Sequence, residues 1–87
     1  MPELKRVHTE HAPAAIGPYS QAVVSDGWVS CSGQIPLDPE TGEQNTGSVA
    51  DQTDLCLRNL EQVLKAAGAS MNSVVKTTVF LSDMNTF

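Results

Sequence analysis

The stretch SVADQTDLCLRNLEQVLKAAG, residues 48–68, predicts a long helix with a signal at each end. Ser48 stands three residues before Asp51, so its side-chain oxygen can accept a hydrogen bond from an otherwise unpaired amide of the first turn. Gly68 is a natural helix terminator. An apolar stripe recurs at alternating spacings of four and three residues: Val49, Thr53, Cys56, Leu60, Val63 and Ala67. On another face, Asp54–Arg58 and Glu61–Lys65 form favourable charge pairs four residues apart.

The sequence before this helix predicts a β-hairpin. Residues 20–24 and 28–32 read as two strands that are joined by Ser25-Asp26-Gly27, and Asp-Gly is a strong hairpin signal. Gly33 interrupts the second strand and Pro36 ends it, and residues 36–47 form a loop rich in turn-forming residues. Residues 3–9 are compatible with a short edge strand.

The sequence after the helix predicts one more strand and the start of a second helix. Residues 74–81, VVKTTVFL, are rich in β-branched side chains. Ser82-Asp83 then resembles a helix cap, with Met84 and Phe87 as the first apolar positions. This order predicts a single α+β domain over residues 1–87, with helices on one sheet face. The other face is expected to be uncovered unless a second subunit packs on it.

Charge and composition argue against several classes of protein. The net charge is −5, and the five basic residues form no cluster, so nucleic acid is not an expected partner. No apolar run is long enough to span a membrane or act as a signal peptide, and two cysteines in apolar patterns fit reduced thiols. We therefore expect a cytoplasmic or organelle-matrix protein. His8 and His11 have no carboxylate or thiol at a ligand spacing, so no metal is expected.

Tyr19 is the one residue that generic chemistry singles out. It is the only tyrosine of the 87 residues, and it directly follows Ile16-Gly17-Pro18. A rigid turn that presents a single phenol can line a pocket. The plainer interpretation is a tyrosine that packs at the start of a strand with its hydroxyl group in water.

Four segments together resemble the RidA family, also called the YjgF family. They are APAAIGPYSQAV (12–23), CSGQIPLDPETG (31–42), NLEQVLKAAGAS (59–70) and VVKTTVFLSDM (74–84), in the order and spacing of that family. The resemblance implies a chorismate-mutase-like α+β fold and a homotrimer with clefts between subunits. It also implies hydrolysis of reactive 2-imino or 2-enamino acids, such as 2-iminobutanoate and 2-iminopropanoate, to 2-keto acids and ammonia, without a metal or cofactor.

The resemblance also implies a set of substrate-binding residues: Tyr19, Ser32, Gly33, Ile35 and Phe87. The family's catalytic groups are an arginine on a late strand, which clamps the substrate carboxylate, and a glutamate near the C-terminus, which orients water. Both fall after Phe87, as does an asparagine of the second helix. No catalytic residue is therefore expected within this chain, which we expect to be a partial sequence covering the N-terminal two-thirds of the family domain.

Two other functions stay open at the level of sequence. One is a non-catalytic, ligand-binding or chaperone-like trimer that uses the same cleft. The other is a ribonuclease or translation inhibitor, an activity also attributed to some relatives, although the acidic charge weighs against it.

Overall fold

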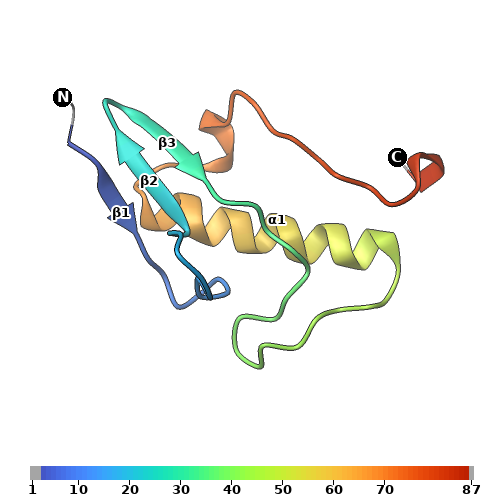
Figure 1. Ribbon diagram of the computed structural model, residues 1–87. Coiled ribbons are helices and arrows are strands. Elements are labelled where there is room, and N and C mark those ends of the chain that lie inside the picture. The colour runs from blue at the N-terminus through green and yellow to red at the C-terminus, as the bar shows by residue number, and fades with distance from the viewer. Residues whose placement is uncertain (1–2, 87) are drawn as a thin grey trace.

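The computed structural model describes residues 3–86, which form a small antiparallel sheet and one long helix (Figure 1). The sheet has three strands in the order β1-β2-β3. The elements are β1 (Lys5–Val7), β2 (Ala22–Ser25), β3 (Trp28–Cys31), α1 (Val49–Ala66) and two 3₁₀ turns, Met71–Ser73 and Met84–Thr86. The predicted α+β class is confirmed.

A tight hairpin joins β2 to β3, as the Asp-Gly signal predicts. Ser25 pairs with Trp28, and the two residues between them have positive φ, 51° at Asp26 and 80° at Gly27. Both signs are those of the turn that matches the natural twist of paired strands. β1 pairs with β2 and places Val7 opposite Ala22, so the short edge strand within residues 3–9 is confirmed.

The ends of α1 follow the sequence signals closely. The Ser48 side chain accepts a hydrogen bond from the Asp51 amide at 3.1 Å. At the other end, the amides of Gly68 and Ala69 donate to the carbonyls of Lys65 and Leu64, and Gly68 has φ +83°. This pair of bonds is a Schellman motif, which satisfies carbonyls that the helix itself leaves unpaired. The predicted helix is therefore confirmed at both ends.

The core lies where the sheet crosses the C-terminal half of α1 (Figure 1). Val63 is fully buried, 0% exposed, and it clusters with Val7, Ala12 and Ala22. The N-terminal part of the predicted stripe is different, because Val49 is exposed. No strand of the described residues crosses that end of the helix, so the stripe is only partly buried.

Residues 74–81 correct the prediction made from their β-branched composition. The structure forms no strand over residues 74–81. This segment is an extended chain that leads away from the sheet (Figure 1). Val75 and Val79 are exposed, and Phe80 is 92% exposed. An extended sequence becomes a strand only when a neighbouring strand pairs with its backbone. The predicted second helix is represented by the 3₁₀ turn Met84–Thr86, and Phe87 lies outside the described residues.

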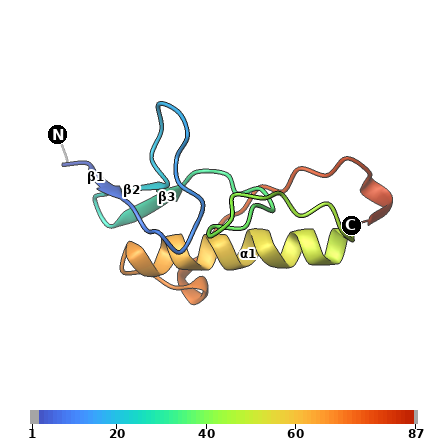
Figure 2. The same cartoon turned by 90° about the horizontal axis from the view of Figure 1, so that it is seen from below.

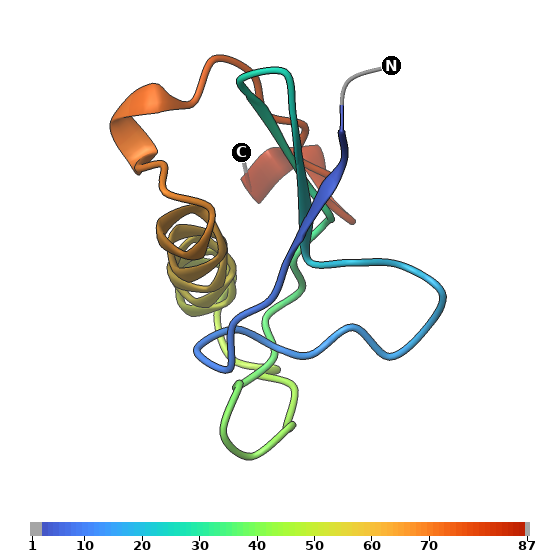
Figure 3. The ribbon, with the colours of Figure 1, turned by 90° about the vertical axis from the view of Figure 1, so that its left-hand side faces the viewer.

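The two faces of the sheet differ. Figures 2 and 3 show α1 against one face, while the blue loop between β1 and β2 projects on the side opposite the helix. Within residues 3–86, no helix is both long and apolar enough to cross a membrane.

Candidate functional site

Tyr19 lies near the end of the projecting loop, three residues before β2 begins at Ala22. A tight turn precedes it, because the Tyr19 amide donates to the Gly17 carbonyl at 2.8 Å. The ring lies against the Gly17 backbone, where a β-carbon would stand 3.5 Å from two ring carbons. Tyr19 is 51% exposed, and Ile16 is almost fully exposed. The turn therefore presents the phenol at an open surface rather than in a closed pocket.

Ser32 joins the end of β3 to the Tyr19 segment. Its amide donates to the Gln21 carbonyl at 3.0 Å, and its hydroxyl donates to the Ser20 carbonyl. Two stretches of chain that are twelve residues apart are thereby held side by side. Gly33 follows at once and is exposed.

Gln21 ties the same segment to the start of the loop. Its side-chain oxygen accepts from the Thr9 amide at 2.7 Å. Its side-chain nitrogen donates to the carbonyls of Thr9 at 3.0 Å, Ala12 at 3.3 Å and Pro13 at 2.8 Å. Gln21 is only 2% exposed. A buried amide group with this many partners closes the base of the loop, because each bond would be costly to lose away from water.

Asn59 anchors the chain that follows Ile35. It is 2% exposed on α1, and its side-chain nitrogen donates to the Leu37 carbonyl at 2.9 Å. The Leu37 amide in turn donates to the Ile35 carbonyl at 2.7 Å, which makes a tight turn with Ile35 exposed at its start. Through Asn59, α1 thus fixes the segment of residues 32–37, which carries Ser32, Gly33 and Ile35.

The structure links the chain segments that carry two of the predicted site residues. Hydrogen bonds join the segments of Tyr19 and Ser32, and Gly33 and Ile35 continue from Ser32 along an exposed stretch. Phe87 lies outside the described residues.

Sequence reasoning missed Gln21 and Asn59. Asn59 interrupts apolar positions of the helix, and Gln21 directly precedes an apolar strand, but neither signal identifies a partner 8 to 22 residues away.

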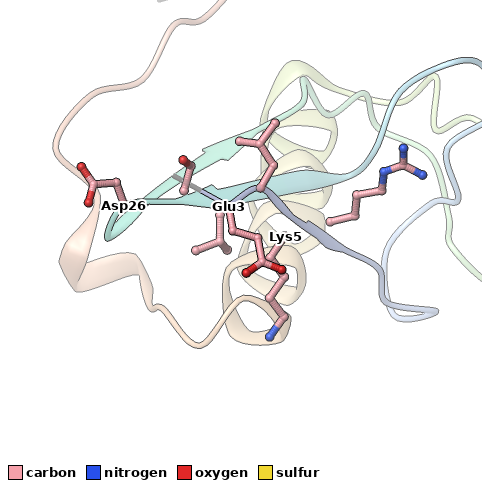
Figure 4. Close-up of a pocket in the computed structure, with 7 residues that line it drawn as sticks. Glu3, Lys5 and Asp26 are labelled. Carbon is pink, nitrogen blue, oxygen red and sulfur yellow. The ribbon is translucent and has the colours of Figure 1, made fainter. Parts of the chain in front are cut away.

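Two grooves of the described chain are lined by residues other than the predicted site residues. One, of about 550 Å³, lies beside the edge strand and the hairpin turn, with Glu3, Lys5 and Asp26 at its rim (Figure 4). A second, of about 490 Å³, is lined by His8, Glu10 and Glu40 among others. Neither of these two grooves includes Tyr19 or Ser32.

Two of the five basic side chains are engaged in ion pairs along α1. Arg58 is bonded to Asp54 at 2.8 Å on the exposed face of α1, and Lys65 lies 3.7 Å from Glu61. Both predicted charge pairs are confirmed. Burial raises the pKa of the Cys31 and Cys56 thiols, which keeps them protonated at neutral pH and disfavours them as nucleophiles. No group of three or more His, Cys, Asp or Glu side chains in residues 3–86 could hold a metal ion.

Known proteins similar to this chain identify its family. Residues 9–87 match the family model described as endoribonuclease L-PSP. The chain is 53% identical over 83 residues to the 2-iminobutanoate/2-iminopropanoate deaminase of Mus musculus, which covers 95% of this chain and 62% of the mouse protein. The chain belongs to the RidA family. A RutC family protein of Pyrococcus horikoshii is 51% identical over 81 residues, or 93% of this chain. The chain spans only 62% of the mouse protein and 64% of the Pyrococcus protein.

Solved structures of RidA relatives share the fold. A protein of the conserved Rid family from Yersinia pestis superposes with a TM-score of 0.93 at 41% identity, over 95% of this chain and 66% of that one. The predicted family and the L-PSP/Rid fold are both confirmed by these matches.

Proposed function

We propose that the protein, in its full natural length, hydrolyses reactive 2-imino and 2-enamino acids to 2-keto acids and ammonia. The observation that carries this proposal is the 53% identity to the mouse 2-iminobutanoate/2-iminopropanoate deaminase. The joined segments of Tyr19 and Ser32 support it, because Tyr19 and Ile35, which follows Ser32 by three residues, both present exposed side chains. A small substrate with one charged end and one short apolar end suits such a surface.

The reaction needs water and no redox step. Water adds to the carbon of the C=N bond, protons move from oxygen to nitrogen, and the C–N bond breaks to leave a keto group and ammonia. We assign the Tyr19 hydroxyl to a hydrogen bond with the substrate. The Ser32 hydroxyl spends its hydrogen on the Ser20 carbonyl, so its lone pairs remain to accept a hydrogen from the substrate nitrogen. We assign the backbone of Gly33 to the same pocket, and Ile35 and Phe87 to its apolar wall.

The substrate carboxylate requires a cation, ideally a bidentate arginine. Arg58 is already paired with Asp54 on the helix face. We therefore propose that an arginine and a water-orienting glutamate come from chain that follows Phe87, and that the pocket closes between subunits of a homotrimer. Two unpaired cysteines are in keeping with a reducing location, the cytosol or an organelle matrix.

The test is a trapping assay with the full-length protein. An amino-acid oxidase generates 2-iminobutanoate in the cuvette, and semicarbazide competes for it, so hydrolysis lowers the rate of semicarbazone formation. We expect this rate to fall progressively as protein is added, because the enzyme takes a growing share of the imino acid. Tyr19→Phe should lower kcat/KM by about tenfold, the value of one hydrogen bond to the substrate. Glu43→Gln, a change at an exposed loop residue, is the control and should leave kcat/KM unchanged. A semicarbazone rate that no concentration of protein changes would refute the proposal.

Cleavage of RNA is the second candidate, because the matching family model is described as an endoribonuclease. The net charge of −5 opposes attraction to a phosphate backbone. We expect no salt-dependent binding of single-stranded RNA. Binding that weakens steeply with salt, together with RNA cleavage that Tyr19→Phe abolishes, would favour the ribonuclease instead.

A further inference from the structure

We propose that Gln21 is the positioning residue that fixes Tyr19 at the candidate site. The position of Tyr19 follows from the structure alone. The effect of Gln21 on turnover rests in addition on the proposed deaminase function.

The Gln21 side chain makes four hydrogen bonds to the backbone at the start of the loop that carries Tyr19. A primary amide has two N–H hydrogens and one carbonyl oxygen. The oxygen accepts from the Thr9 amide, and the nitrogen reaches the Thr9, Ala12 and Pro13 carbonyls at 2.8 to 3.3 Å. Because Gln21 is 2% exposed, water cannot replace these partners easily.

The same residue holds the other side of the loop through its backbone. The Gln21 carbonyl accepts from the Ser32 amide, and the neighbouring Ser20 carbonyl accepts from the Ser32 hydroxyl. Gln21 therefore links the start of the loop, its end and the strand β3. Tyr19 stands only two positions before this junction.

Apart from the bonds at its base, the loop contains the tight turn in which the Tyr19 amide donates to the Gly17 carbonyl. Its residues 14–20 are mostly exposed, and the loop projects away from α1 (Figure 3). A projecting loop takes its position from the contacts at its base, and displacing a substrate-binding group by about 1 Å can cost up to about a hundredfold in rate. Gln21 makes four side-chain hydrogen bonds at that base, so its loss should move Tyr19.

The test compares Gln21→Met with Gln52→Met in the full-length protein. Methionine has nearly the length of glutamine but forms none of the four bonds. Gln52 is the matched control, because its side chain also donates to a backbone carbonyl, that of Gly47 at 2.8 Å, at the start of α1. The readout is the ¹⁹F NMR signal of Tyr19 in protein labelled with 3-fluorotyrosine, assigned by its loss in Tyr19→Phe.

We expect Gln21→Met to move the Tyr19 signal toward that of the unfolded protein and to lower kcat/KM for the imino acid about tenfold or more. Gln52→Met should match the wild type in both measurements. A folded Gln21→Met with an unmoved Tyr19 signal would overturn the proposal. Since the signal is recorded without substrate, it tests the position of Tyr19 even if the proposed deaminase activity is absent.

A second measurement on the wild type covers the case in which Gln21→Met fails to fold. Hydrogen exchange of the Thr9 amide reports directly on its bond to Gln21. We expect the Thr9 amide to lose its protection from exchange over the same range of denaturant concentration in which the native Tyr19 signal disappears. A Tyr19 signal that is lost while the Thr9 amide is still protected would show that Gln21 does not position Tyr19.

Discussion

Two segments of the chain, residues 9–37 with the hairpin and the extended residues 74–81, differ in how they are held to the rest of the molecule. Both contain β-branched residues, and both reach an exposed surface. The first is tied by Gln21 to its own base and by Asn59 to α1. For the second, the described residues provide no pairing strand. The difference teaches that composition sets an extended conformation, whereas contacts distant in sequence give it a fixed place.

The largest expected effect contrasts a valine of the core with a valine of the extended segment. Val63→Ala removes apolar atoms from a site that is 0% exposed, and should lower the free energy of unfolding by about 2 to 3 kcal/mol. Val79→Ala at an exposed position should change it by less than about 0.5 kcal/mol. Urea unfolding of the 87-residue chain measures both. Equal losses at the two valines would break the comparison, because Val79 would then have a packing partner.

The next effect tests the hydrogen bond by which Asn59 fixes the segment of residues 32–37 to α1. Asn59→Ala leaves the Leu37 carbonyl without its side-chain donor and should cost about 1 to 2 kcal/mol. Asn72→Ala, at an exposed residue of a 3₁₀ turn, is the matched control and should cost less than about 0.5 kcal/mol. The same unfolding experiment gives both values. If Asn59→Ala were as mild as the control, the bond to Leu37 would not hold this segment.

The sequence predicted the parts of the fold whose causes are local. The Ser48 cap, the Gly68 stop and the Asp26-Gly27 turn each depend on a few neighbouring residues, and all three are confirmed. The strand expected over residues 74–81 failed, because pairing depends on a partner that local composition does not reveal.

The candidate site shows the same division. Tyr19 was noticed as a lone phenol after a rigid turn, but only the resemblance to the RidA family linked it with Ser32. The contact between their segments arises from the hairpin, which returns the chain to the same place after twelve residues. The buried amides of Gln21 and Asn59 were missed, because a polar residue in an apolar pattern is ordinarily solvent-exposed.

The smallest expected effect lies at the boundary between the two regions, where Gly68 ends α1 and directs the chain toward the extended segment. Gly68 has φ +83°, so a β-carbon there is strained although the space around it is open. Gly68→Ala should therefore lower the free energy of unfolding by about 1 kcal/mol. At Gly17 a β-carbon would meet the Tyr19 ring at an ordinary contact distance of 3.5 Å, so Gly17→Ala should change the stability by less than about 0.5 kcal/mol. Thermal unfolding of the two variants compares them. A larger loss at Gly17 would mean that the tyrosine turn, rather than the helix end, is the strained part of the chain, and it would assign to that loop a rigidity of its own beyond the bonds made by Gln21.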